Sequence, residues 1–335
     1  MKNRKISIED VARRAGVSIS TVSRVVNHLP TVRPKIQAKV EEAIAYYKYQ
    51  PNVSAQRLAR GTNNAIGLVM PGYPGIFHSF YAIELIRGVG HACETLHLDM
   101  VFHITNGFNP INTNNVGGVI FADIIENRKQ VETALEIGVP SIVINNVVND
   151  LEISFVGVDN KLGGKMAGDY LSNLGHKRIA IITGNLKTQG GFDRFEGFKQ
   201  SLRNNKIPLP ENYVFEGDYS RRSSRIAAEK FFALPEQPSA IFACSDEMAL
   251  EVVAVVNEHG LKVPQNVSII GFDDNPASLY SAVALTTIHQ PLFQMAETSV
   301  KHLYSLISGK KKTPLKSILS PELVIRDSCS HPAKA

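Results

Sequence analysis

Hydrophobic positions in the first fifty residues recur at helical spacing and predict a group of three short helices. Two of them lie between Ile8 and Asn27, and a third runs from about Pro34 to Tyr47. The inner faces of the first two carry small apolar side chains: Val11, Ala12, Ala15, Val22, Val25 and Val26. Ser7 and Ser18 can cap these helices, and Gly16 between them suits a left-handed turn. The pattern therefore predicts a helix-turn-helix with a supporting third helix.

The outer face of the second predicted helix is polar and carries one positive charge. Its residues are Ser20, Thr21, Ser23, Arg24 and Asn27. A short helix with small hydrogen-bonding side chains beside an Arg fits into the major groove of DNA. The alternative interpretation is an ordinary helical hairpin whose polar face is solvated.

From residue 65 onward, short apolar runs alternate with helical patterns, which is typical of parallel α/β sheets. The alternation runs from 65 to 144, then starts again at Lys161 and continues to 272. Two consecutive halves predict two lobes, and residues 285–291 are expected to return the chain to the first lobe. The predicted fold class is an all-α helix-turn-helix headpiece followed by an α/β core of two doubly wound parallel-sheet lobes.

Charge is unevenly distributed along the chain. Residues 1–62 contain twelve Lys and Arg and four Asp and Glu, a net charge of +8, whereas the whole chain of 335 residues carries +5. The remaining residues therefore carry −3, so the positive charge belongs to the predicted helix-turn-helix region. This asymmetry is expected of a phosphate-binding segment.

Composition and motifs exclude several other classes of protein. No apolar run is long enough to span a bilayer, and the basic first residues are not followed by the apolar stretch of a secretory signal. The three cysteines are far apart and lack metal-ligand spacing, which predicts reduced thiols in a cytoplasmic protein. The sequence lacks a Gly-x-Ser-x-Gly elbow, a phosphate-binding loop and a His-Glu-x-x-His motif. We therefore expect no enzyme activity, no catalytic residues, no metal and no cofactor.

The segment D-V-A-R-R-A-G-V-S-I-S-T-V-S-R-V-V-N resembles, without a break, the headpiece signature of the LacI/GalR family of bacterial transcription regulators. Later segments resemble core motifs of the same family in the same order, among them V-G-V-D-N-K-L-G-G, S-D-E-M-A-L, G-F-D-D and L-T-T-I-H-Q-P. The resemblance extends from about Ile6 to Ser328. It implies a DNA-binding transcription repressor with a core similar to periplasmic sugar-binding proteins.

The resemblance divides the chain into a headpiece at 1–50, a hinge helix or linker at 51–62 and an effector-binding and dimerisation core at 63–328. The first lobe is expected at 63–157 and 289–320, the second at 158–286 and 321–328, and a disordered tail at 329–335. Composition alone favours a plain linker, because eight helix-permissive residues are too few for a stable isolated helix. In the family the matching segment is a helix that is ordered only on operator DNA. Its Leu, here Leu58, wedges into the minor groove.

By position on the second helix, Ile19, Ser20 and Arg24 are expected to contact base edges. Contacts to phosphates, which fix the register without reading the sequence, are expected from Thr21, Ser23, Asn27 and Arg33. His28, in the following loop, is also among the expected DNA contacts. Like the family it resembles, the protein is expected to be a homodimer whose two headpieces bind the two halves of a double-stranded operator.

Ligands of open α/β sheets bind at the carboxyl ends of the strands, which selects the residues that follow each predicted strand. In sugar-binding members of the family, an Arg, an Asp and an aromatic residue at the positions of Arg194, Asp273 and Tyr219 face the effector. A bidentate Arg and a carboxylate suit vicinal hydroxyls, and an aromatic face packs on the C–H surface of a sugar. Further candidates are Ser245, which stands where many members have Asn, together with Asn145, Tyr73 and Phe77.

The expected effector is therefore a saccharide bound in a cleft between the lobes. A purine or another small metabolite is the alternative effector. The alternative function is a sugar-binding protein without a DNA role, against which the headpiece and the missing secretory signal argue.

One segment departs from the family pattern. Thirteen residues, Thr105 to Gly117, stand where the family has a full helix between two strands of the first lobe. They are rich in Asn, Gly and Pro, which favours a loop. We expect a short connection there, and a sheet that has lost cover on one face.

Overall fold

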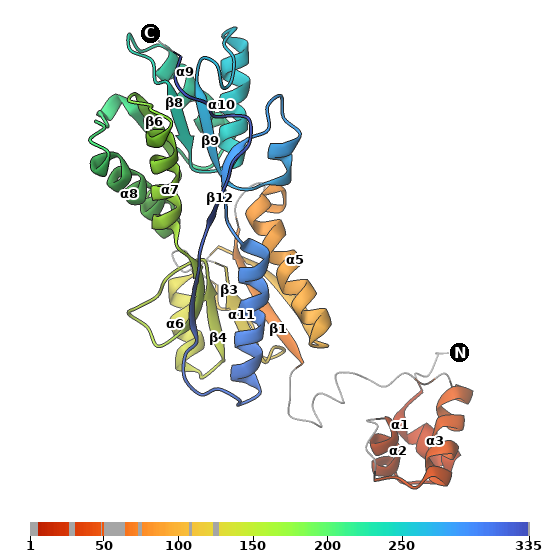
Figure 1. Cartoon of the computed structure of the whole chain (residues 1–335). Helices are drawn as coiled ribbons and strands as arrows, with labels where there is room; N and C mark the ends of the chain where they lie inside the picture. The colour runs from red at the N-terminus through yellow and green to blue at the C-terminus, as the bar shows by residue number, and fades with distance from the viewer. Residues whose placement is uncertain are drawn as a thin grey trace. The chain divides into compact units, whose positions relative to one another are not determined.

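The structure of the chain, a computed structural model, describes residues 6–26, 31–47, 49, 64–72, 76–106, 109–122 and 127–333. It divides into two compact units, Met1–Asn64 and Ala65–Ala335. Figure 1 shows that the first unit is helical and that the second has two α/β lobes. Within the described ranges, no helix is long and apolar enough to cross a membrane.

The described part of the first unit contains the helices α1 (Ile8–Ala15), α2 (Ile19–Val26) and α3 (Pro34–Tyr47), as the hydrophobic spacing predicts. Helix α1 begins with a reciprocal capping box: the Ser7 hydroxyl accepts from the Asp10 N–H, and the Asp10 carboxylate accepts from the Ser7 N–H. The α1–α2 turn contains Gly16 at a φ of 64°. The core of this unit consists of Val11, Ala12, Ala15, Val22, Val25, Val40 and Ala43.

The first lobe is built on a six-stranded parallel sheet in the order β11-β5-β4-β3-β1-β2. The strands are β1 (Ala65–Pro71), β2 (Asp99–Thr105), β3 (Gly118–Phe121), β4 (Ser141–Ile144), β5 (Ser154–Val158) and β11 (Lys316–Leu319). The helices are η1 (Ile76–His78), α5 (Phe80–Thr95), α6 (Arg128–Glu136) and α11 (Leu292–Ile307). Helices α5 and α11 pack on one face of the sheet, and α6 packs on the other (Figure 1).

The connection between β2 and β3 contains no helix in its described residues, so the predicted short loop is confirmed. The loop nevertheless places buried Val116 and half-buried Ile111 against the sheet, on the side covered by α6. The expectation of a bare sheet face is therefore wrong in part, because the loop supplies apolar side chains of its own.

The second lobe has a sheet in the order β12-β10-β9-β8-β6-β7, parallel except for the β10–β12 pair. Its strands are β6 (Ile179–Thr183), β7 (Val214–Glu216), β8 (Ala240–Ala243), β9 (Ser268–Asp273), β10 (Thr286–His289) and β12 (Glu322–Val324). Its helices are α7 (Asn160–Asn173), α8 (Gln189–Asn204), η2 (Glu211–Tyr213), α9 (Arg221–Phe232), α10 (Asp246–Glu258) and η3 (Pro276–Leu279). Helices α7 and α8 lie on one side of this sheet, and α9 and α10 lie on the other (Figure 1).

The described chain passes between the lobes at three places: from β5 to α7, from β10 to α11 and from β11 to β12. The carboxyl ends of the parallel strands of both sheets lie at the boundary that these passages cross. The chain returns to the first lobe between β10 and α11, at the end of the predicted stretch 285–291.

The predicted disordered tail is wrong for residues 329–331. The Cys329 thiol donates to the Ile269 carbonyl at 3.2 Å, and the Ser330 N–H donates to the Ser268 hydroxyl at 3.0 Å. His331 Nδ1 lies 2.8 Å from the Leu174 carbonyl. The segment follows the start of β9 and satisfies polar groups there, which its polar composition does not reveal.

Candidate functional sites

The outer face of α2 is the candidate DNA-reading surface. Val22 and Val25 are buried, so the opposite side of the helix is turned to solvent. Ile19 is 48% exposed, and Ser20 and Arg24 are also exposed. Thr21 and Ser23 are half-buried at the edge of this face. The structure thus places all five of these predicted residues on or beside one accessible helix face.

Local hydrogen bonds fix the start of α2. The Ser18 hydroxyl accepts from the Thr21 N–H at 3.2 Å, which is the predicted cap. The same hydroxyl lies 2.8 Å from the Ser20 hydroxyl and 2.9 Å from the Thr21 hydroxyl. Arg33 is exposed at the start of α3, where its carbonyl accepts from the Ile36 N–H. The predicted DNA contacts Asn27, His28 and Leu58 lie outside the described residues.

The candidate effector site is centred on the buried side chain of Arg194, on the second turn of α8. Helix α8 begins at Gln189, because the Thr188 hydroxyl caps it by accepting from the Gly191 N–H. This start places Arg194 inside the helix, and its guanidinium reaches the Cys244 carbonyl at the end of β8. The Arg194 Cζ lies 3.6 Å from the centroid of the Phe272 ring, so the cation is stacked on an aromatic face.

Three protein acceptors hold the guanidinium. Nε donates to Asn160 Oδ1 at 2.8 Å, Nη1 donates to the Cys244 carbonyl at 2.7 Å, and Nη2 donates to Gln290 Oε1 at 2.8 Å. These acceptors come from the start of α7, the end of β8 and the passage after β10. Sequence reasoning missed Asn160 and Gln290, although both lie in motifs that it singled out. We call Arg194, Asn160, Phe272, Asp273 and Gln290 the Arg194 cluster.

Asp273 stands at the end of β9 with a φ of 114°, a backbone conformation that L residues rarely adopt. Its Oδ1 lies 3.8 Å from Arg194 Nη1. Burial raises the pKa of the Asp273 carboxyl from 3.8 to about 7, although the positive charge of Arg194 lowers it. Strained backbone at a strand end, beside a buried cation, is typical of ligand sites.

Tyr219 also has a positive φ, of 66°, and its ring lies against Gly184. A Cβ at Gly184 would be 2.0 Å from the Tyr219 Cζ, so only glycine permits this approach. Burial raises the pKa of the Tyr219 hydroxyl, while the charge of Arg194 and a hydrogen bond with Thr188 lower it. The structure therefore brings Tyr219 to the same end of the sheet as Arg194 and Asp273.

Asn145 links the first lobe to this cluster. It follows β4 with a φ of 63°, and its Oδ1 accepts from Gln290 Nε2 at 3.2 Å. Gln290 therefore contacts Asn145 of the first lobe through its nitrogen and Arg194 of the second lobe through its oxygen. A second pair of bonds joins the lobes nearby, where the Gln189 side chain contacts both backbone groups of Val147.

The remaining predicted effector residues have other positions. Ser245 is buried and caps α10, since its hydroxyl accepts from the Met248 N–H at 3.3 Å. The next residue, Asp246, is buried and accepts from the Thr287 hydroxyl at 2.6 Å and from the Asn275 N–H at 2.7 Å. Phe77 is 56% exposed, with its ring 6.0 Å from that of Phe102. Tyr73 lies outside the described residues.

A helix-turn-helix unit joined to a two-lobed parallel α/β core defines a DNA-binding regulator with a periplasmic-binding-protein-like core. Comparisons with known proteins agree with this class. Residues 7–52 match the family model "Bacterial regulatory proteins, lacI family", and residues 169–329 match "Periplasmic binding protein-like domain". The HTH-type transcriptional regulator DegA of Bacillus subtilis (strain 168) is 34% identical over 337 residues, which covers 97% of this chain and 98% of DegA. The chain therefore belongs to the lacI family of bacterial transcription regulators, which are not enzymes, and the predicted family is confirmed.

Solved structures of similar fold cover nearly the whole chain. The lac repressor dimer bound to operator and the anti-inducer ONPF has a TM-score of 0.85 and 27% identity, covering 98% of this chain and 100% of that one. A complex of the transcriptional regulator CelR with cellobiose has a TM-score of 0.71 and 26% identity, covering 96% of this chain and 99% of that one. The predicted fold class is confirmed.

Proposed function

We propose that this protein is an operator-binding repressor whose DNA affinity is controlled by a saccharide bound at the Arg194 cluster. The main observation in support of this effector site is the buried guanidinium of Arg194. A guanidinium has five N–H groups, and described residues accept from three of them. One N–H on each terminal nitrogen then remains, and N–H groups of a guanidinium can donate to the hydroxyl oxygens of a sugar.

Asp273 and Tyr219 support a saccharide as the ligand. A carboxylate beside the guanidinium accepts hydrogen bonds from hydroxyls, and an aromatic ring offers a surface for the C–H face of a sugar. The cellobiose complex of CelR shows that a relative of the same fold binds a saccharide. The second candidate is a purine or another small planar metabolite, for which the Tyr219 ring offers a stacking surface.

A ligand panel tests this site. Thermal unfolding of the full chain is measured with mono- and disaccharides and with purines, because a ligand that binds only the folded state raises the melting temperature. We expect a saccharide to raise it, and Arg194→Lys to abolish this shift, because Lys keeps the charge but loses the fork. Arg203→Lys, on the same helix, is the matched control. A saccharide shift that survives Arg194→Lys contradicts the proposed site, and a shift with purines alone favours the second candidate.

We propose that α2 enters the major groove, with Ile19, Ser20 and Arg24 contacting bases. Thr21, Ser23, Asn27 and Arg33 then contact phosphates, and His28 is a further DNA contact. A gel shift with the protein's own promoter tests these roles. Arg24→Ala should reduce operator preference by about 1–3 kcal/mol, the value of one good base contact. Arg13→Ala, which removes the same charge from the exposed side of α1, should weaken binding to all sequences alike.

The same proposal includes a homodimer, a hinge at residues 51–62 and a cytoplasmic location. The lac repressor in the operator complex is a dimer, and two headpieces would match the two halves of a near-palindromic operator. Leu58→Ala should weaken specific binding more than non-specific binding if Leu58 wedges between base steps. If the protein is instead a sugar-binding protein without a DNA role, the gel shift should show no salt-sensitive, sequence-dependent band.

The direction of control follows from which lobe arrangement the effector prefers. An effector that favours the arrangement competent for operator binding acts as a co-repressor, and one that favours the other arrangement acts as an inducer. Operator titrations with and without the saccharide found in the panel measure this direction.

A further inference from the structure

Asp274 directly follows the candidate effector residue Asp273, but its carboxylate bonds to other parts of the second lobe. Oδ1 accepts from Arg326 Nη2 at 2.6 Å, and Oδ2 lies 3.1 Å from His289 Nδ1. The side chains of Asp274 and Arg326 are only 23% and 15% exposed, so solvent screens their ion pair weakly. We call Asp274, His289 and Arg326 the Asp274 link.

The turn that carries Asp273 and Asp274 is held by contacts from several elements. The two residues have φ values of 114° and 59°, and side chains at such angles persist only where the surroundings hold them. Buried Asp246 accepts from the Asn275 N–H at 2.7 Å, and the Asp274 link supplies further contacts. Because both residues belong to one constrained turn, a displacement of Asp273 must also displace Asp274 or break its bonds.

The Asp274 link reaches two of the passages between the lobes. His289 is the last residue of β10, in register with Asp273 of β9, and the next residue is Gln290, which bonds to the first lobe. Arg326 lies two residues after β12, the strand that the chain enters from β11 of the first lobe. Its Nη1 donates to the Leu285 carbonyl at 2.9 Å, just before β10. One carboxylate therefore joins the turn with Asp273 to the strands of both passages.

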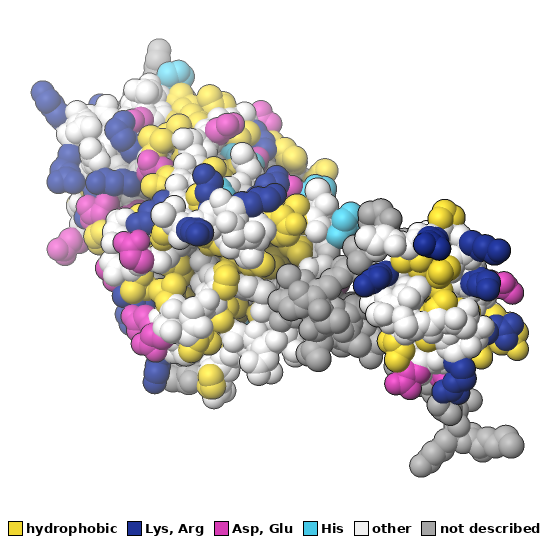
Figure 2. Space-filling model, turned by 90° about the horizontal axis from the view of Figure 1, so that it is seen from below, with side chains coloured by type: hydrophobic (Ala, Val, Ile, Leu, Met, Phe, Trp, Pro, Cys, Tyr) yellow, Lys and Arg dark blue, Asp and Glu magenta, His cyan; other side chains and the backbone are white. Residues whose placement is uncertain are grey.

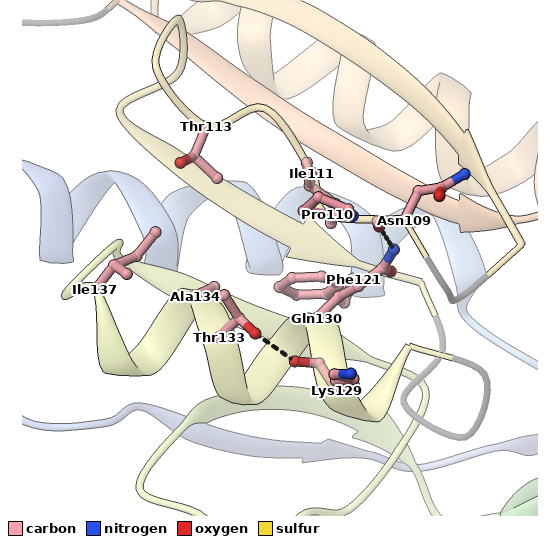
Figure 3. Close-up of a pocket in the computed structure, with 10 residues that line it drawn as sticks. All are labelled: Asn109, Pro110, Ile111, Thr113, Phe121, Lys129, Gln130, Thr133, Ala134 and Ile137. Atoms are coloured by element: carbon pink, nitrogen blue, oxygen red, sulfur yellow. Dashed lines mark hydrogen bonds between the residues drawn. The ribbon is translucent and has the colours of Figure 1, made fainter.

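The pocket shown in Figure 3 is separate from this link. It has a volume of about 180 Å³ and lies between residues 109–113 and α6, and its lining includes no residue of the Asp274 link or of the Arg194 cluster. Figure 2 shows positive and negative side chains interspersed on one face of the core. The Asp274 link is therefore distinguished by its bonds to the passages, and not by a cavity or by surface charge.

We propose that Asp274 is a positioning residue that transmits ligand binding at Asp273 to the arrangement of the two lobes. This inference rests on the proposed function, because it requires a ligand that contacts Asp273. A ligand that displaces Asp273 displaces Asp274 as well, and the bonds of Asp274 move His289 and Arg326 with it. Both chain passages are then shifted. Removing the link should therefore leave ligand binding in place and weaken its effect on operator binding, which is the coupling between the two sites.

The test measures ligand binding and coupling separately on the full chain, with glucose, galactose, ribose and cellobiose as probes. Calorimetry gives the affinity for each saccharide, and a gel shift with the protein's own promoter gives the operator affinity with and without it. His289→Ala removes one arm of the link and leaves the Arg326 pair in place. We expect it to lower the effect of the saccharide on operator affinity at least about threefold and to change the saccharide affinity less than about twofold.

A second variant and a matched control accompany His289→Ala. Asp274→Asn should also lower the effect, because Asn tolerates a positive φ but has one carbonyl oxygen for two donors. His259→Ala removes a contact of 2.8 Å to the Glu229 carboxylate in the same lobe, and the side chains of His259 and His289 are equally exposed, at 39% and 40%. This control should leave the effect unchanged. Circular dichroism verifies that each variant is folded.

Three results would overturn the proposal. The first is an effect of the saccharide on operator affinity that stays at the wild-type value in both His289→Ala and Asp274→Asn. The second is an equal loss of this effect in His259→Ala. The third is loss of saccharide binding itself in His289→Ala, which would make His289 part of the binding site.

Hydrogen exchange of the free protein tests the link without a saccharide. Both link variants should raise the exchange rate of residues 286–291 at least about threefold, because these residues lose a contact that holds them. An unchanged rate refutes the link. If no saccharide binds the wild type or alters its operator affinity, the proposed saccharide control is wrong, whereas a raised exchange rate still supports the positioning role of Asp274.

Discussion

The Asp273 carboxyl makes the stability of the core depend on pH in a direction that is unusual for an acid. Its folded-state pKa, about 7, lies above the ordinary value of 3.8 because the group is buried. Protonation therefore favours the folded state: the stabilising contribution is complete below about pH 4 and is lost as the pH rises through 7. Between pH 8 and pH 6, Asp273 goes from about one-tenth to nine-tenths protonated when folded and stays ionised when unfolded. This raises the free energy of unfolding by about 1.4 kcal/mol.

Effector binding should change in the opposite direction. If the ionised Asp273 accepts hydrogen bonds from saccharide hydroxyls, the same protonation removes the acceptor. The affinity should then fall about tenfold from pH 8 to pH 6, which corresponds to the same 1.4 kcal/mol. A protein that becomes more stable while it binds its effector more weakly is a specific signature of this carboxyl.

Urea unfolding at pH 6 and pH 8, on the wild type and on Asp273→Asn, measures the effect. Asn does not titrate, so the difference between the two proteins cancels the contributions of histidines elsewhere. The pKa of Asp246 is also well above its usual range, because of burial and the nearby charge of Asp273, so Asp246→Asn is measured in parallel. If Asp273→Asn keeps the wild-type pH dependence and Asp246→Asn loses it, the titrating group is Asp246 and our assignment is wrong.

Three further predictions concern the surroundings of the site. Gly184→Ala should displace the Tyr219 ring, since the new Cβ would lie 2.0 Å from the Tyr219 Cζ. The thermal shift with saccharide should then fall, while the circular dichroism spectrum stays unchanged. Gln189→Ala removes two bonds to the first-lobe backbone and should cost about 1–3 kcal/mol in urea unfolding; an unchanged midpoint would show that these bonds contribute nothing. Deleting residues 329–335 removes the Ser330 contacts to Ser268 and His176, so the melting temperature should fall, contrary to the behaviour of a disordered tail.

Much of the fold follows from local patterns. The three headpiece helices were predictable because capping residues and apolar spacing act within a few residues of sequence, as in the Ser7–Asp10 capping box. The start of α8 was not predictable from the sequence. Its cap is Thr188, and the Gly-Gly pair that follows ordinarily argues against a helix. The docked end of the chain was missed for a different reason: its partners, such as Ser268, lie 62 residues away.

Some residues of the candidate effector site were predictable from the sequence and others were not. Arg194 and Asp273 were predicted from their places after strands, where ligands of α/β sheets bind. Their partners were not predicted, because the Arg194 contacts to Asn160 and Gln290 span 34 and 96 residues. A position after a strand does not by itself predict a ligand contact. Ser245 follows a strand as expected, but its hydroxyl caps a helix.

Gln290 explains why a ligand at this place would act on the whole molecule. Its oxygen accepts from Arg194 and its nitrogen donates to Asn145, so one amide is bonded to both lobes in a single orientation. A rotation of one lobe that moves Asn145 away from Arg194 must break one of these bonds, whereas a ligand bridging Arg194 to the first lobe would replace it. A ligand alters an equilibrium only by its differential affinity for the two arrangements. The remaining N–H groups of Arg194 and the Gln290 amide are therefore the groups through which such a difference would be expressed.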